Sequence, residues 1–279
     1  MSSPSRSRVS DLIGDRPLTA RSVLASALLG ADEPHLSVAV LVAAASLFGI
    51  SAGAARTCLW RMASDGELTS GNGTYALAGH LLERRHRVDD AARADDATVR
   101  PWDGTWELAV VSLERRPAAD RLELRKAARA LHLAEIREGV WIRPDNLDPG
   151  RLPASRAVLD VQCVHFHGAA SDIDAGTVRS LFSLDRWATD AARLTTAMQD
   201  ELGSAAVELG DTAAALRYQF ALSISVVRHL QLDPLLPAAL QPERWPATRL
   251  RATYRRFDRA FKRRMNRATF EPDNRQNVR

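Results

Sequence analysis

The sequence predicts a multidomain α+β protein made of an N-terminal winged helix-turn-helix, a ferredoxin-like middle domain and a C-terminal helical domain. Three observations predict this fold class. Three helical patterns are followed by two short extended segments that a Gly-Asn-Gly turn joins. Between residues 105 and 168, apolar segments rich in β-branched residues alternate with a helical pattern. Beyond residue 184 only helical patterns remain.

The composition predicts a soluble cytoplasmic protein. The chain has 279 residues, of which 46% are hydrophobic, so it can bury a substantial core. Its two cysteines, Cys58 and Cys163, form no disulfide framework, which favours a reducing compartment. The first residues lack the apolar core of a signal peptide, and the most apolar run, 36–50, is shorter than the ~20 residues that span a bilayer. We therefore expect no membrane partner.

The first domain is expected over residues 1–80. One helix should run from about residue 18 to 30, and a second, capped by Ser37, should end at Gly49. Ser51 should cap the third helix, and extended segments follow at 67–70 and 74–77. The inward side of the third helix is expected to hold Ala55, Leu59 and Met62.

The outward side of the third helix is the candidate DNA-reading surface. In a winged helix-turn-helix this helix lies in the major groove, where arginine pairs with guanine or phosphate and an aromatic ring packs on sugar or a thymine methyl. The alternative is an amphipathic helix whose tryptophan covers a neighbouring domain. The predicted DNA-binding residues are Ser51, Arg56, Thr57, Trp60, Arg61 and, in the hairpin turn, Asn72.

The charge of this first domain predicts a homodimer. Residues 1–80 contain six arginines and six acidic residues, so their net charge is zero. A single copy would bind DNA weakly, because phosphate neutralisation supplies much of the affinity. We therefore expect two copies on a pseudo-palindromic double-stranded operator.

A connector is expected at 81–100 and the α+β middle domain at 101–182, with strands at 105–113, 139–144 and 157–168 and a helix from residue 118. Cys163, His165 and His167 alternate along the last strand, a pattern that can supply zinc ligands. Residues two apart on a strand are separated by about 6.5 Å, so we expect side chains of a core or interface, and no metal.

The C-terminal helical domain is expected over residues 183–279. Its last helix, 247–270, carries nine basic residues against one acid beside an apolar stripe that should dock on the protein body. The basic face is either solvated or in contact with an anion, namely flanking DNA phosphates or a ligand. Arg255 and Arg256 are the candidate effector-binding residues.

No catalytic signature stands out. The chain has no glycine-rich phosphate loop, no G-x-S-x-G and no H-E-x-x-H. We therefore expect no enzyme and no cofactor.

Four segments carry a resemblance to the PaaX-like transcriptional repressors, which control phenylacetate catabolism and related pathways. These are ISAGAARTCLWRMASDGEL, WDGTWELAVV, EGVWIRP and LDPLLPAALQPERWP. The resemblance implies a Cas2-like middle domain and a ligand-responsive repressor that an aryl-acyl-CoA releases from DNA.

Two departures from that family bear on function. The wing, SGNGTYAL, has no arginine, whereas the family's wing is usually basic and aromatic. Ser112 stands where a Cas2-like nuclease carries an acid, with Glu114 displaced. The alternative function, a Cas2-like metal-dependent phosphodiesterase with an appended DNA-binding module, needs a carboxylate pair that the sequence does not show. A third alternative, a protein-interaction scaffold, leaves the outward arginines unused.

Overall fold

The computed structural model describes residues 19–33, 35–85, 100–113, 115–170, 172–206 and 213–270. Most of the expected connector, 86–99, and Glu114 lie outside these residues. The chain divides into two compact units. Unit 1 comprises residues 1–89, 193–228 and 249–279, and unit 2 comprises 90–192 and 229–248. Residues 183–279, expected as one helical domain, are thus shared between the two units.

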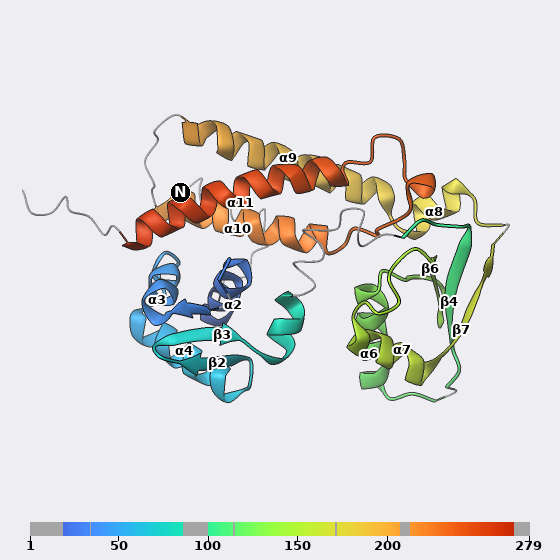
Figure 1. The fold of residues 1–279 in the computed structure, drawn as a ribbon, viewed down its shortest axis with the longest axis horizontal. Helices are drawn as coiled ribbons and strands as arrows, with labels where there is room; N and C mark the ends of the chain where they lie inside the picture. The colour runs from blue at the N-terminus through green and yellow to red at the C-terminus, as the bar shows by residue number, and fades with distance from the viewer. Residues whose placement is uncertain are drawn as a thin grey trace, which may run out of the picture. The chain divides into compact units, whose positions relative to one another are not determined.

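The N-terminal part of unit 1 contains three helices and a small sheet, followed by a further helical segment over residues 79–85 (Figure 1, blue to teal). Each helix begins after a side chain that accepts a main-chain N–H, namely Thr19, Ser37 or Ser51. The strands pair antiparallel in the order β1-β3-β2. The elements are α2 (Ala20–Gly30), β1 (His35–Ser37), α3 (Val38–Ser46), α4 (Ala52–Ser64), β2 (Leu68–Gly71) and β3 (Thr74–Leu77).

A shared apolar core holds these elements together. Leu24 and Leu28 of α2, Leu41 of α3 and Leu59 of α4 are at most 2% exposed and belong to one cluster. Each lies on the apolar stripe that its helical spacing predicts. The sheet closes the cluster through Leu68 and Leu77.

Three long helices contribute to unit 1 further along the chain: α9 (Leu184–Ala206), α10 (Ala213–Leu230) and α11 (Ala247–Phe270). Phe220 of α10 lies with its ring centroid 5.0 Å from that of Phe48 and 6.2 Å from that of Phe261. Arg217 donates to the carbonyl of Leu47 at 3.1 Å. Helix α10 therefore packs between the end of α3 and helix α11.

Unit 2 is built on a four-stranded antiparallel sheet in the order β5-β6-β4-β7 (Figure 1). One face of the sheet packs on α6 and α7 through Ala109, Trp141 and Leu159. The other face packs through Trp106 and Ile142 on the segment around α8. The elements are β4 (Thr105–Val111), α6 (Ala118–Ala130), β5 (Ala134–Arg137), β6 (Val140–Pro144), α7 (Pro153–Gln162), β7 (Cys163–Ala169), α8 (Ala175–Leu181) and the 3₁₀ helix η1 (Ala238–Leu240). The α+β middle domain is confirmed.

The expectation of a single strand over 157–168 is wrong in its first half. Helix α7 continues to Gln162, and strand β7 begins only at Cys163. Proline suits the first turn of a helix, and Pro153 stands there. The helix start signal at Pro153 therefore outweighs the strand preference of the β-branched residues that follow it.

The segment LDPLLPAALQPERWP completes unit 2. Asn146 donates from Nδ2 to the carbonyl of Leu235 at 3.0 Å, although 89 positions separate the two residues. Leu236 enters the core beside Trp106, and Trp245 stacks on Trp187 with ring centroids 4.6 Å apart. This distinctive sequence has a structural role in closing the unit.

Among the described residues, no helix is both long enough and apolar enough to cross a membrane.

Candidate functional site

Helix α4 is positioned by its cap and by its buried side. The Ser51 hydroxyl accepts the N–H of Ala54 at 3.2 Å, which satisfies a donor that the first turn would leave unpaired. Ala55, Leu59 and Met62 are at most 1% exposed. The helix ends before Gly66, where φ is +73° and glycine is favoured. Its rotation about its own axis is therefore fixed.

The opposite side of α4 is open to solvent. Arg56, Thr57 and Arg61 are exposed, and the Trp60 side chain is 66% exposed. Residues three and four apart share a helix face, so these side chains form one surface. Within the described part of the chain, neither arginine forms an ion pair or a hydrogen bond. Large apolar rings are rarely left so exposed, so Trp60 makes this face a candidate contact surface.

Cys58 lies beside this surface and is half-buried. Burial raises the pKa of its thiol, while the charges of Arg21 and Arg61 oppose that shift. The thiol therefore stays protonated at neutral pH and is not an activated nucleophile.

The hairpin carries the remaining predicted DNA-binding residue. Asn72 (φ 49°) and Gly73 (φ 70°) form the turn between β2 and β3, and both backbones are left-handed, as a tight two-residue hairpin turn requires. Asn72 is exposed at the tip. The structure thus places five predicted residues on or at the start of α4, and Asn72 on a separate element.

The two candidate effector residues lie on another helix of unit 1. Arg255 and Arg256 are exposed on α11, whose buried stripe is Leu250, Tyr254, Phe257 and Phe261. Lys262 of the same helix contacts Asp32 at 2.6 Å and Asp258 at 2.7 Å. Neither Arg255 nor Arg256 lines the two cavities described next.

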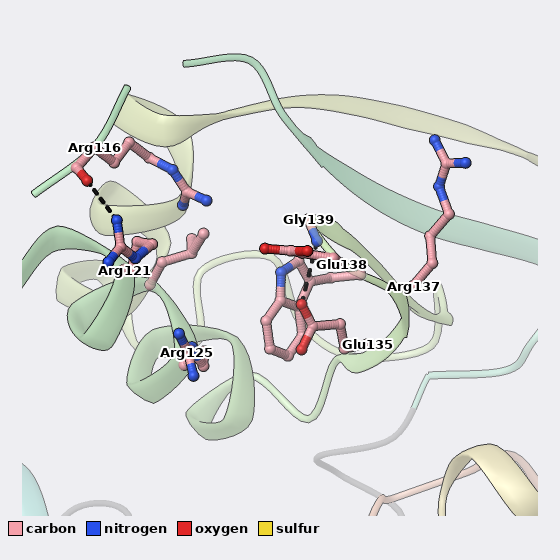
Figure 2. Close-up of a pocket in the computed structure, with 9 residues that line it drawn as sticks. Arg116, Arg121, Arg125, Glu135, Arg137, Glu138 and Gly139 are labelled. Atoms are coloured by element: carbon pink, nitrogen blue, oxygen red, sulfur yellow. Dashed lines mark hydrogen bonds between the residues drawn. The ribbon is translucent and has the colours of Figure 1, made fainter. Parts of the chain in front are cut away.

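One cavity of unit 2, with a volume of about 410 Å³, lies between α6 and the β5–β6 turn (Figure 2). Arginines of the α6 side lie across it from Glu135 of β5 and Glu138 of the turn. Sequence reasoning missed this site, although Arg121 and Arg125, four apart on a helix, signalled a shared face. Its lining residues are Arg116, Arg121, Leu124, Arg125, Glu135, Arg137, Glu138, Gly139 and Trp141.

A second cavity, of about 550 Å³, contains the two histidines of β7. His165 places Nε2 3.2 Å from Asp160, and His167 places Nδ1 3.0 Å from Asp145. Glu107 is buried and paired with Arg156. Among the described residues, no group of histidine, cysteine or acidic side chains is arranged to hold a metal. The side chains of this cavity mostly pair with one another.

Fully buried Arg143 lines the same cavity. Burial lowers its pKa to about 9, and the nearby carboxylate of Glu107 opposes that shift. Its guanidinium donates to the carbonyls of Leu131 and Pro144 and to Oδ1 of Asn146, at 2.7–2.9 Å. The charge is retained at neutral pH and satisfied internally, so Arg143 joins β6 to its surroundings and is not free to hold a ligand.

The match to a known protein family lies in unit 2. A family model described as the PaaX protein central Cas2-like domain matches residues 99–171, which contain the four-stranded sheet with α6 and α7. The chain is also similar to a solved structure, the uncharacterized protein Rv0674 from Mycobacterium tuberculosis. The two are 32% identical with a TM-score of 0.66, over 90% of this chain and 99% of that one. No protein of curated function matches the sequence.

The chain belongs to the PaaX family. Membership indicates a transcription regulator rather than an enzyme.

Proposed function

We propose that the protein is a ligand-responsive transcriptional repressor that binds operator DNA through α4. The observation that carries this proposal is the outward face of that helix, where Trp60 is 66% exposed between two arginines that form no ion pair within the described chain. Helices α2, α3 and α4 followed by the β2–β3 hairpin have the order of a winged helix-turn-helix. Helix α4 then takes the place of the reading helix.

The chemistry of this face suits double-stranded DNA. Arg56 and Arg61 can each donate two hydrogen bonds to guanine or neutralise a phosphate. The Trp60 ring offers an apolar surface for a sugar or a thymine methyl. The exposed start of α4 at Ser51 can offer main-chain N–H groups to a phosphate. Asn72 at the hairpin tip adds a neutral contact, so the wing contributes less charge than the helix.

The protein is proposed to act as a homodimer. Residues 1–80 carry no net charge, so two copies are needed to gather enough phosphate contacts. Two copies related by a two-fold axis read a pseudo-palindromic site, with half-site centres about one helical turn apart or a multiple of it.

An acyl-CoA-type thioester is the proposed effector, on the strength of family membership. Its pyrophosphate and ribose phosphate suit arginine better than lysine. Arg255 and Arg256 of α11 are the proposed contacts, either with these groups or with DNA phosphates that flank the operator.

The decisive experiment is a genome-wide DNA pull-down with the full chain, followed by salt-dependent binding to the best site. Trp60→Ala should abolish most enrichment while leaving thermal unfolding unchanged, because the ring is exposed. Leu122→Ala is the matched control, since Leu122 is 53% exposed on α6 of the other unit. Equal enrichment by the parent and the Trp60→Ala variant would refute the role of α4.

A further inference from the structure

The cavity between α6 and the β5–β6 turn has the make-up of a ligand site, and nothing in the proposed DNA contacts uses it. Arg116, Arg121 and Arg125 approach from one side, while Glu135 and Glu138 approach from the other (Figure 2). Arg137 also lines the cavity but points away from them. We call Arg116, Arg121 and Arg125 the basic wall.

Two of the three arginines of the basic wall are held in place before any ligand arrives. Arg116 donates from Nη1 to Oε1 of Gln162 at 3.2 Å. Arg121 donates from Nη1 to the carbonyl of Arg116 at 2.8 Å. Arg125 lies one helical turn beyond Arg121 on α6. Preorganised guanidinium groups lose less entropy when they bind, which favours recognition over general charge attraction.

The positive charge of this wall is not neutralised by the protein. The partners of Arg116 and Arg121 are an amide and a carbonyl, and no carboxylate of the described residues pairs with any of the three arginines. Like charges held close together repel one another, and an anion placed among them removes that repulsion. The arrangement therefore favours an oxyanion over a neutral ligand.

An unpartnered donor lies at the same cavity. Trp141 is 4% exposed, and its Nε1 atom is buried without a hydrogen-bond partner among the described residues. Leaving such a donor buried and unpaired is energetically unfavourable. A ligand oxygen that reaches this indole would recover that cost, and the Trp141 ring would provide an apolar floor.

The opposite wall limits the charge of the ligand. Glu135 accepts the N–H of Gly139 at 3.2 Å and is fixed by it, whereas Glu138 is exposed. Both carboxylates repel negative charge that extends across the cavity. The ligand should therefore carry its negative charge at one end.

We propose that this cavity binds a small organic ligand through a terminal carboxylate or phosphate, which the basic wall holds while an oxygen of the ligand accepts a hydrogen bond from Trp141. The site lies wholly within unit 2, so its occupancy can be measured without DNA. Failure of the DNA proposal would leave this one standing, and the reverse also holds.

The test is isothermal titration of the full chain with inorganic phosphate and, separately, with acetate, at constant ionic strength. We expect saturable binding of at least one probe at one site per chain. Binding of phosphate alone identifies a phosphate ligand, and binding of acetate alone identifies a carboxylate ligand. Saturable binding of neither probe would overturn the proposal.

Two double variants of α6 distinguish binding at a defined site from general electrostatic attraction. Replacing both Arg121 and Arg125 by glutamine should weaken probe binding by about tenfold or more. The matched control replaces Lys126 and Arg129 by glutamine, which removes the same charge from exposed positions of α6 outside the cavity. Equal losses in both double variants would show nonspecific attraction and sink the proposal.

Two further substitutions test the walls individually. Trp141→Phe keeps an aromatic ring, although a smaller one, and removes the N–H, so it should weaken probe binding without changing the unfolding temperature by more than a few degrees. Glu138→Gln should strengthen probe binding, because a charge that repels the anion is removed. An unchanged affinity in both variants would contradict the proposed position of the ligand.

Discussion

Helices α4 and α11 both bury one side in unit 1 and present arginines on the other, but they use their charge differently. On α4, Arg56 and Arg61 form no ion pair within the described chain. On α11, Lys262 is held by Asp32 and Asp258, and Arg255 also has a partner within the protein. Both basic residues of α4 are without such a partner, whereas on α11 at least five of the nine, namely Arg251, Arg255, Lys262, Arg264 and Arg267, have one.

This difference shows that charge count alone does not locate a binding surface. Helix α11 has nine basic residues and α4 only two. A basic side chain that is already paired must break its contact before it binds DNA, and the gain is correspondingly smaller. Exposure of Trp60 adds an apolar surface that the described outer side chains of α11 do not provide. We therefore expect α4 to give specificity in DNA binding, and α11 to give stability together with either general phosphate attraction or contact with the effector.

The largest effect should come from the buried side of α11. Phe257→Ala should lower the free energy of unfolding by about 3–5 kcal/mol, because the ring is 2% exposed and its loss leaves a cavity. Chemical denaturation monitored by circular dichroism measures this. Arg256→Ala, one position away and exposed, should change it by less than about 0.5 kcal/mol. Similar losses from both would show that α11 does not dock as described.

The next effect concerns the outward side of α4. Arg56→Ala should weaken operator binding by about 1–3 kcal/mol and relax the preference at one base pair if the side chain reads guanine. Fluorescence anisotropy with a set of single-base operator variants measures both. Arg129→Ala, an exposed arginine of unit 2, is the control for general charge loss. A variant that binds every operator as the parent does would contradict the assignment.

A smaller effect should separate the two proposed roles of α11. If Arg255 and Arg256 follow DNA phosphates, replacing both by glutamine should reduce the salt dependence by roughly one unit of slope for each phosphate that is no longer neutralised. If they hold the effector, DNA affinity should be retained and release by a thioester such as phenylacetyl-CoA weakened. Operator binding across a salt series, with and without the thioester, distinguishes these outcomes. A variant unchanged in both assays would show that Arg255 and Arg256 contact neither DNA nor effector and are simply solvated.

The smallest effect is a loss of stability at alkaline pH. Burial raises the pKa of Tyr254 above its usual 10.0. Burial alone would lower the pKa of Lys262, but its bonds to Asp258 and Asp32 raise it above 10.5. In both cases the unfolded chain loses its proton first, so the free energy of unfolding should fall as pH rises above about 10. Tyr254→Phe should flatten that decline in urea titrations, and a decline as steep as the parent's would contradict the role of Tyr254.

The sequence predicted long or strongly signalled elements well and short ones poorly. The caps at Ser37 and Ser51 and the Asn72–Gly73 turn lie where local chemistry requires them. Strands β1 and β5 and helix α8 were missed, because three to seven residues show too little periodicity and are fixed by pairing and packing. The start of α7 was misread because the β-branched residues outweighed Pro153.

The two candidate sites, the outward face of α4 and the cavity of unit 2, also differ in how far the sequence predicts them. The face of α4 was predictable, since a single helix fixes which side chains share a side. The cavity of unit 2 was not, because Arg116, Gln162 and Trp141 come from separate segments that only the folded sheet brings together. The buried indole N–H leaves no trace in the sequence pattern.

The bond between Asn146 and Leu235 has a consequence for how the protein is made. Unit 2 takes its last core residues from 229–248, and unit 1 draws on helix α11, which follows them in the chain. On the ribosome, unit 2 cannot complete its core until residues 229–248 have been made, and unit 1 cannot complete its core until α11 has been made. Loops of this length close slowly, so apolar surfaces meant for α10 and α11 stay uncovered meanwhile. A prematurely terminated chain that ends before residue 229 would leave both cores open, which makes it a substrate for chaperones and proteases.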